Sequence, residues 1–351
     1  MVEKGKIEKG VVSMLKLNMG VKSGERLLIT TDVSTSVEWI KKESRELAQM
    51  MERSLLAKMV YEIASEKFPD CNVEFYTYPS VGRNGIEPGK EAQEKMKEAD
   101  VVIAITSYSL SHTEARESAT KSGTRVASMP KFTSEMFYPG GPMMADYTKI
   151  HEECKKIVKL VDQANDAIVT SPSGTNLKFS LKGRKGTIDD GIYVRKGMFG
   201  NLPAGEVYVA PLEGTTNGNL VVKRGWFANM EETMTFVFKD GQVVQVNGGG
   251  RIGKEFRDIL ACGKDEEPYL SRRNHAELGI GTNPNARQPD NMLEAEKIRG
   301  TVHIAIGDNS HFGGKVSADL HQDFVIPKPT MKFDDKMVIE NGEIIAAPFA
   351  N

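Results

Sequence analysis

An imidazole and a carboxylate stand two residues apart in the run 319–326, which otherwise has the apolar character of a β-strand. Side chains at positions i and i+2 of a strand point to the same face, so we predict that His321 and Asp323 project together. The chain has only six histidines, and four of them fall between residues 275 and 321. The pair provides half of a metal site, although a neutral hydrogen bond between the two side chains is an open alternative.

Three further segments place a charged or imidazole side chain among apolar residues. His303 lies in the run GTVHIAIG, where small neighbours leave space beside it. Glu277 stands just before glycines in AELGIG, and Glu206 begins an apolar run after Pro-Ala-Gly. An ionised carboxylate in apolar surroundings is unfavourable unless it is paired or bound to a metal. One cation site would satisfy all four segments.

Each of these residues also has a simpler interpretation. His303 fits a hydrogen-bonded histidine of the core. Glu206 fits an exposed turn residue. Glu277 fits a salt bridge to Arg272 or Arg273. The metal hypothesis therefore depends on the segments converging in the fold.

Composition limits the kinds of partner that the chain can bind. It has 351 residues, with 46 Lys and Arg against 48 Asp and Glu, so its net charge of -2 favours neither nucleic acid nor an anionic membrane. The odd number of cysteines, which predicts no disulfide framework, suits a reducing compartment. We interpret Cys71, Cys154 and Cys262 as buried thiols. With no signal-peptide pattern and no apolar run of about 18 residues, we expect a cytoplasmic protein with a small ligand.

The pattern of apolar runs predicts two domains, 1–167 and 168–351. In the first, continuous apolar runs alternate with helical stretches, which predicts an open parallel α/β sandwich. Its expected strands are 26–30, 73–76 and 100–104, and its expected helices are 37–67 and 89–99, with a surface helix at 146–167.

The second domain is predicted to be β-rich and mixed, and to carry the metal site. Asp240-Gly241 and Asn341-Gly342 each stand between alternating segments, as in type I′ hairpins. The run 248–253 matches the dinucleotide-binding pattern G-x-G-x-x-G. However, the strand before it belongs to a hairpin and not to a βαβ unit. A glycine-rich turn is therefore the favoured interpretation.

Four motifs follow one another in the carboxy-terminal half: PAGEVYVAP, AELGIGTN, GTVHIAIG and DLHQD. This ordered series resembles the aminopeptidase T family of metallopeptidases, also called the thermophilic leucyl aminopeptidase family. The resemblance implies an amino-terminal α/β domain, a carboxy-terminal domain with a dinuclear metal site, and a homodimer. It also implies five metal ligands, which are Glu206, Glu277, His303, His321 and Asp323.

The same resemblance implies hydrolysis of amino-terminal residues from short peptides or aminoacyl substrates. Two divalent ions, Zn, Co or Mn, would activate a water, and Glu277 would bridge them. Asp308 or His311 would pass a proton to the leaving amine, unless both are solvated loop residues. No nucleic acid, membrane or organic cofactor is expected.

Two features depart from the family pattern. The spacing from His303 to His321 is short, so a loop over the site is trimmed. The family tyrosine beyond the strand histidine has no counterpart in the run 307–314. Both changes bear on substrate fit more than on metal binding.

Two other functions remain open. A non-haem Fe(II) ring-cleaving dioxygenase of the dihydroxypyridine type also resembles this family, and its facial triad would be His321 and Asp323 with His303 or His275. The additional carboxylates at 206 and 277 argue against a mononuclear triad. A dimeric binding protein with a degenerate site is the third possibility.

Overall fold

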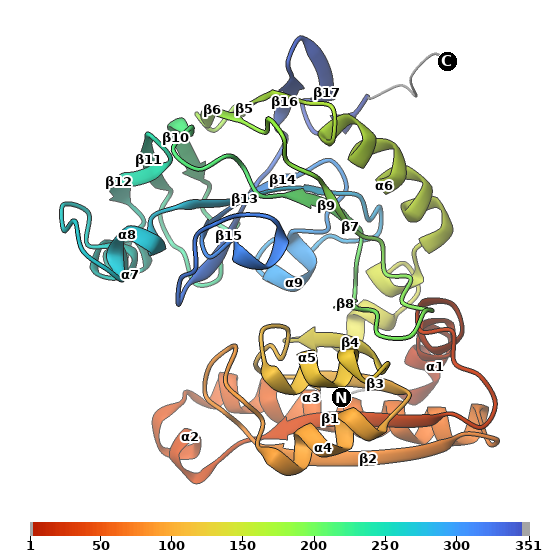
Figure 1. Cartoon of the computed structure of the whole chain (residues 1–351). Coiled ribbons are helices and arrows are strands. Elements are labelled where there is room, and N and C mark those ends of the chain that lie inside the picture. The colour runs from red at the N-terminus through yellow and green to blue at the C-terminus, as the bar shows by residue number, and fades with distance from the viewer. Residues whose placement is uncertain (1–2, 346–351) are drawn as a thin grey trace. The chain divides into compact units, whose positions relative to one another are not determined.

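The computed structural model describes residues 3–345, and its contacts divide the chain into two compact units (Figure 1). The first unit comprises residues 1–147 and 191–204, and the second comprises 148–190 and 205–351. The chain therefore leaves the first unit, returns to it briefly and leaves again. The predicted boundary between residues 167 and 168 stays a prediction.

The first unit is built on a parallel sheet with the strand order β2-β1-β3-β4-β8. Residues Ala92, Met96, Ala115 and Ala119 of two helices, α4 and α5, pack in one apolar cluster with strand residues that include Val102. Helix α3 packs on β1, β2 and β3. The predicted open α/β sandwich is confirmed. The elements are α1 (Lys4–Ser13), η1 (Met14–Asn18), β1 (Arg26–Val33), α2 (Ser36–Lys41), α3 (Ser44–Lys67), β2 (Asn72–Pro79), α4 (Lys90–Glu98), β3 (Val101–Thr106), α5 (Glu114–Lys121), β4 (Arg125–Pro130), η2 (Ser134–Phe137), η3 (Pro142–Met144) and β8 (Phe199–Asn201).

The helix predicted over 37–67 is two helices, α2 and α3. Lys42 adopts an extended conformation, with φ -90° and ψ 150°, and so interrupts the helix. A capping box between Thr35 and Glu38 fixes the start of α2. The helix predicted over 146–167 is α6 (Tyr147–Val161), which ends earlier because residues from Asp166 form a strand.

The second unit contains two largely antiparallel sheets. Their strand orders are β12-β11-β10-β6-β5-β16-β17-β18 and β15-β14-β13-β9-β7. This agrees with the predicted β-rich, mixed character. The elements are β5 (Asp166–Thr170), β6 (Asn176–Ser180), β7 (Thr187–Asp189), β9 (Glu206–Val209), β10 (Asn217–Val222), β11 (Met234–Lys239), β12 (Gln242–Gly248), α7 (Gly250–Leu260), α8 (Tyr269–Arg272), β13 (His275–Gly281), α9 (Met292–Ala295), β14 (Val302–Gly307), η4 (Ser310–Phe312), β15 (His321–Ile326), β16 (Thr330–Phe333), β17 (Lys336–Glu340) and β18 (Glu343–Ile344).

Both predicted hairpins are confirmed. Asp240 and Gly241 join β11 to β12 with φ values of 48° and 79°, and Asn341 and Gly342 join β17 to β18 with 49° and 86°. These left-handed conformations explain the choice of residues. The glycine-rich run joins β12 directly to α7: Gly248 ends the strand, Gly249 turns the chain in a left-handed conformation with φ 77°, and Gly250 begins the helix. The glycines permit a close approach, because a Cβ at position 253 would lie 1.9 Å from the carbonyl oxygen of Gly248.

The structure bears on two expectations from composition, the burial of the cysteines and the absence of a membrane-spanning segment. Only Cys154 is buried, whereas Cys71 and Cys262 are half-buried, so the interpretation of all three as buried thiols is wrong for two of them. Within residues 3–345, no helix combines the length and apolar character that crossing a bilayer requires.

In the second unit, the sheet β15-β14-β13-β9-β7, hereafter called the five-stranded sheet, packs one face on the eight-stranded sheet through aromatic side chains. Phe324 of β15 is fully buried, and its ring centroid lies 4.6 Å from that of Phe236 on β11 and 5.2 Å from that of Phe256 on α7. Because side chains alternate along a strand, His321 and Asp323 lie on the opposite face of β15. The aromatic cluster therefore holds the strand that carries both candidate ligands.

We predict that Phe324→Ala lowers the free energy of unfolding of the second unit by about 3–5 kcal/mol, because it leaves a cavity between the two sheets. Chemical denaturation followed by circular dichroism measures the change. Val244→Ala, at a position that is 43% exposed, is the control and is expected to change stability by less than about 1 kcal/mol. Equal effects of the two substitutions would contradict the assignment of Phe324 to this core.

Candidate metal site

The second face of the five-stranded sheet is polar. Strand register places Asp189 opposite Glu206, and Glu277 opposite Ala305, which in turn lies opposite Asp323. Residues that pair across strands, and residues two apart along a strand, share a face. One face therefore carries Asp189, Glu206, Tyr208, Glu277, His303, His321 and Asp323.

Three of these side chains converge closely enough to hold one metal ion. The donor atoms of Glu277, His321 and Asp323 lie within 4.8 Å of one another. The Nε2 atom of His321 is 3.4 Å from Glu277 Oε2 and 3.6 Å from Asp323 Oδ1. No other set of three His, Cys, Asp or Glu side chains within residues 3–345 meets this criterion. One imidazole and two carboxylates form a suitable donor set for a divalent first-row ion.

Small residues on the polar face make this convergence possible. Ala305 lies between Glu277 and Asp323 in the register and leaves space between the two carboxylates. A Cβ at position 279 would lie only 1.8 Å from the Nε2 atom of His303. Glycine at this position therefore allows the imidazole of His303 to reach across β13.

A backbone carbonyl fixes the orientation of His321. The Nδ1 atom of His321 is 2.8 Å from the carbonyl oxygen of Asp308, which only accepts hydrogen bonds, so Nδ1 donates. Nε2 is thereby directed toward Glu277 and Asp323, as is usual for a metal-ligating histidine. Burial lowers the pKa of His321, but the charges of Asp323 and Glu277 outweigh it and raise the pKa well above its usual value. A metal ion must therefore displace a proton from this ring.

His303 links the three converging side chains to a second carboxylate. Its Nε2 atom lies 3.2 Å from Glu277 Oε1 and 3.5 Å from Glu206 Oε2. Although burial opposes the charged form, the hydrogen bond to Glu277 and the charge of Glu206 raise the pKa of His303 to about 9. For Glu277, burial favours the neutral form, but His303 and His321 outweigh it and lower its pKa. Glu277 is thus held as a carboxylate.

Glu206 is engaged by a lysine. The Nζ atom of Lys297 lies 2.5 Å from Glu206 Oε1 and 2.8 Å from Glu296 Oε1, and 4.0 Å from Asp189 Oδ2. Lys297 is 1% exposed. Burial alone would lower the pKa of Lys297, but the carboxylates of Glu206 and Glu296 raise it well above its usual value. The lysine is therefore a buried ammonium.

The five predicted ligands thus lie on one face but do not form one coordination set. Glu277, His321 and Asp323 converge, while His303 and Glu206 lie beside them. Two simpler interpretations are wrong. Glu206 is 6% exposed and is no exposed turn residue.

The alternative in which Glu277 forms a salt bridge with a neighbouring arginine is also wrong. Arg272 binds the carboxylate of Asp319, and Arg273 donates to Asp265 and to the carbonyl oxygen of Lys264. Both arginines are therefore engaged with other groups, and neither neutralises Glu277.

His275 does not join the converging side chains. Its Nδ1 atom lies 2.6 Å from the hydroxyl of Thr216 and its Nε2 atom 3.1 Å from the carbonyl oxygen of Glu277. Burial lowers the pKa of His275 to about 4, so the ring is neutral. The suggestion that His275 completes an iron triad is therefore wrong, since both ring nitrogens are occupied.

Asp308 and His311 lie in the loop between β14 and β15. The Asp308 carboxylate accepts hydrogen bonds from the backbone of Ser310 and Ala318, so it holds the loop together. The side chain of His311 is 65% exposed. The Nε2 atom of His311 lies 3.9 Å from Asp308 Oδ1. The predicted role of either residue in proton transfer stays a prediction.

Sequence reasoning missed the surroundings of the site. Tyr208 shares the polar face with Glu206 by simple alternation, so the pattern contained a signal for it. Its ring packs edge-on against Phe312, at 5.5 Å between centroids, and Phe312 packs edge-on against His321 at 5.9 Å. Lys297 had no signal, since the run EAEKIRG is typical of a solvated segment.

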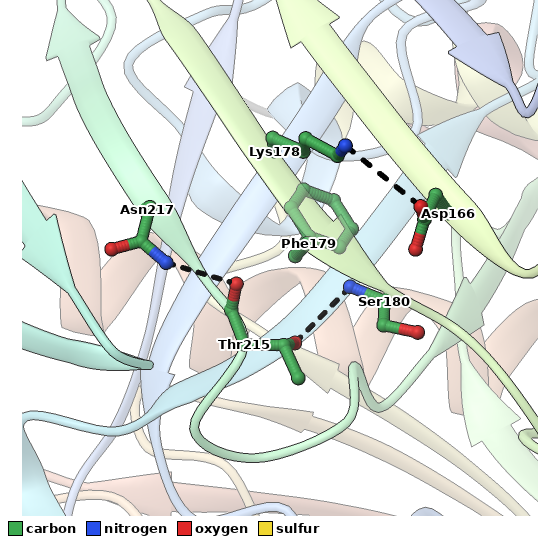
Figure 2. A pocket seen from close by; sticks show the side chains of 6 residues that line it. All are labelled: Asp166, Lys178, Phe179, Ser180, Thr215 and Asn217. Carbon is green, nitrogen blue, oxygen red and sulfur yellow. Dashed lines mark hydrogen bonds and ion pairs between the residues drawn. The ribbon is translucent and has the colours of Figure 1, made fainter.

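A separate shallow pocket lies on the eight-stranded sheet. Figure 2 shows the side chains that line it, with an ion pair between Lys178 and Asp166 on neighbouring strands. The remaining lining residues are Phe179, Ser180, Thr215 and Asn217. None of the candidate metal ligands lines this pocket.

Two solved structures share the fold. The structure of 2,5-dihydroxypyridine dioxygenase from Pseudomonas putida KT2440 matches with a TM-score of 0.73 and 17% identity, over 99% of each chain. Wild-type AmpT from Thermus thermophilus matches with a TM-score of 0.65 and 13% identity, over 97% of this chain and 99% of that one. At these identities the two likenesses establish the fold alone.

Sequence comparisons decide between the dioxygenase family and the aminopeptidase T family. A curated 2,5-dihydroxypyridine 5,6-dioxygenase from Pseudomonas putida is 24% identical over 272 residues, which cover 73% of each chain. The family model for 2,5-dihydroxypyridine 5,6-dioxygenase matches residues 10–346. The assignment to the aminopeptidase T family is therefore wrong, and with it the predicted metallo-aminopeptidase, protease and hydrolase activity.

The cofactor prediction is corrected by the same finding. Two Zn, Co or Mn ions were expected, whereas dioxygenases of this family typically use a single iron ion. The motif series misled because the converging carboxylates and imidazoles suit either site. With a family match that spans nearly its whole length, this chain belongs to the 2,5-dihydroxypyridine 5,6-dioxygenase family.

Proposed function

We propose that this protein is a ring-cleaving dioxygenase that acts on a dihydroxylated pyridine and depends on one Fe(II) ion. Glu277, His321 and Asp323 would hold the ion. The observation that carries the proposal is the convergence of these three side chains on one sheet face, in a chain of this family. The dihydroxypyridine alternative considered from the sequence thus becomes the main proposal.

The donor set fits iron with one change from the expected triad. Non-haem Fe(II) oxygenases commonly use two histidines and one carboxylate. Here one histidine and two carboxylates converge, and the second nearby histidine, His303, is hydrogen-bonded to the ligand Glu277. His303 therefore supports the carboxylate from outside the donor set, as partners of metal ligands do.

The surroundings suit a planar aromatic substrate. When bound, Fe(II) would supply the redox chemistry that joins dioxygen to a dihydroxylated ring. The rings of Phe312 and Tyr208 follow His321 in successive edge-on contacts. Aromatic faces of this kind bind planar rings by stacking or edge contacts. Burial raises the pKa of Tyr208, so its hydroxyl stays protonated and is available as a hydrogen-bond donor.

The position of the three proposed ligands also fits substrate access. The side chains of His321 and Asp323 are 23% and 15% exposed, whereas the side chains of Glu206 and Lys297 are 8% and 1% exposed. The proposed metal end is thus the more accessible end of the polar face. A small-molecule substrate replaces the predicted peptide, and the predicted homodimer stays a prediction.

The first prediction concerns activity. Protein reconstituted with Fe(II) is expected to consume dioxygen when 2,5-dihydroxypyridine is added and to stop after chelation of the iron. An oxygen electrode and the loss of the aromatic ultraviolet absorbance measure the reaction. Aminoacyl amides serve as the comparison and are expected to remain intact. Folded, iron-loaded protein that leaves dihydroxypyridines unchanged would overturn the proposal.

The second prediction concerns the ligands. His321→Ala is expected to reduce affinity for Mn(II), used as a probe, by at least about 100-fold, because it removes one of three protein donors. Glu277→Gln is expected to act in the same direction. His311→Ala, at an exposed position in the adjacent loop, is the matched control and is expected to bind like the unchanged protein. Isothermal titration calorimetry gives the affinities, and normal binding by His321→Ala would disprove the assignment.

The third prediction concerns pH. Because the pKa of His321 is raised in the metal-free protein, an incoming ion must displace its proton. Apparent affinity for Mn(II) is therefore expected to fall as the pH falls, by up to about tenfold per pH unit for one proton. Calorimetry in buffers with different ionisation enthalpies counts the protons released. Binding without proton release would contradict the geometry around His321.

A further inference from the structure

Charged side chains alternate along the polar face of the five-stranded sheet. From the accessible end, Asp323 and Glu277 lie on either side of His321, His303 lies between Glu277 and Glu206, and Lys297 follows Glu206. A cation or an imidazole thus separates each carboxylate from the next. Buried charges require such compensation, since an unpaired charge loses its hydration and gains nothing in return.

The fold places Lys297 firmly. The carbonyl oxygen of Lys297 accepts a hydrogen bond from the backbone N–H of Asn283 at 2.8 Å, just beyond β13. A Cβ at position 281 would lie 2.2 Å from the carbonyl oxygen of Ile298, so Gly281 allows this segment to lie against the sheet. These backbone contacts therefore fix the segment that carries Lys297 against the sheet, and its side chain is buried and not a mobile group on the surface.

Lys297 meets a set of oxygen atoms that otherwise suits a cation. The carboxylates of Glu206 and Glu296 lie within 2.8 Å of its Nζ atom, and that of Asp189 lies at 4.0 Å. Without the ammonium, the carboxylates of Glu206, Glu296 and Asp189 would face one another, and only His303 would remain as a cationic partner beside Glu206. Oxygen-rich sites of this kind bind divalent ions.

We propose that Lys297 is an internal cation that takes the place of a second metal ion and thereby limits the site to one divalent ion per chain. Lys297 pairs with Glu206, Glu296 and Asp189 and is not one of the three proposed ligands. The inference rests on the proposed function for the position of the first ion. It goes beyond that function, because it names the residue that sets the number of ions.

The test measures metal stoichiometry in the full chain, with Mn(II) alone as the probe. Lys297→Met keeps the length of the side chain and removes its charge. The unchanged protein is expected to bind one Mn(II) per chain and Lys297→Met to bind two, measured by equilibrium dialysis with elemental analysis. Electron paramagnetic resonance gives a second readout, since two neighbouring Mn(II) ions are spin-coupled and an isolated ion is not.

A second variant tests whether Glu206 lies outside the donor set of the first ion. Glu206→Gln, with Lys297 retained, is expected to keep its one ion with an affinity that changes by less than about tenfold, because Glu206 is no ligand of that ion. A loss of more than about 100-fold would identify Glu206 as a ligand and overturn the inference. Lys254→Met is the matched control, since Lys254 is 72% exposed and pairs with Asp258 on the surface of α7.

Remaining outcomes are also decisive. A folded Lys297→Met protein with one ion, or an unchanged protein with two, contradicts the inference. If Lys297→Met is unfolded without metal, Mn(II) must restore its circular dichroism spectrum with two ions bound, and failure to do so counts against the inference. Stoichiometry does not depend on turnover. An unchanged protein that binds one ion but leaves dihydroxypyridines intact therefore refutes the proposed function and not this inference.

Discussion

Compensation of buried negative charge is the constraint on which the second unit depends. Asp189, Glu206, Glu277 and Glu296 carry acidic side chains in or beside the polar face of one sheet. For the three glutamates, burial opposes the ionised form and by itself raises the pKa. At one end a fixed ammonium, that of Lys297, compensates them. At the other end His303 and His321 hold Glu277 as a carboxylate. A metal ion there would complete the same compensation and would replace a proton on His321.

One face of the five-stranded sheet packs in the core, and the other face carries the candidate metal ligands. Phe324 anchors β15 in the aromatic contact with the eight-stranded sheet, while the alternate residues of the same strand, His321 and Asp323, carry donors. Small residues at 279, 281 and 305 then decide which side chains meet on the polar face. Packing on the other face of the sheet therefore fixes β15, the strand that presents His321 and Asp323.

The incorrect aminopeptidase assignment has a physical explanation. A series of carboxylates and imidazoles at strand positions predicts that cations are needed, but it does not count them. Glu206 and His303 have the residue types of metal ligands, yet Glu206 is paired with an ammonium and His303 with two carboxylates. In the proposed arrangement, the difference between one ion and two lies in Lys297, a residue outside every motif that suggested the family.

The sequence by itself determined the parallel α/β architecture of the first unit, the two hairpins and the shared face of His321 and Asp323, because these follow from local periodicity and turn chemistry. Alternation likewise placed Glu277 and His303 on strand faces. Only the tertiary structure decided which of these faces coincide, since strand register is a long-range property. It also decided that Lys297 is buried against Glu206, that the carbonyl of Asp308 orients His321, and that His275 is occupied elsewhere. The contacts of Lys297 with Glu206 and of His275 with Thr216 join residues far apart in the chain, where no local pattern specifies the partner.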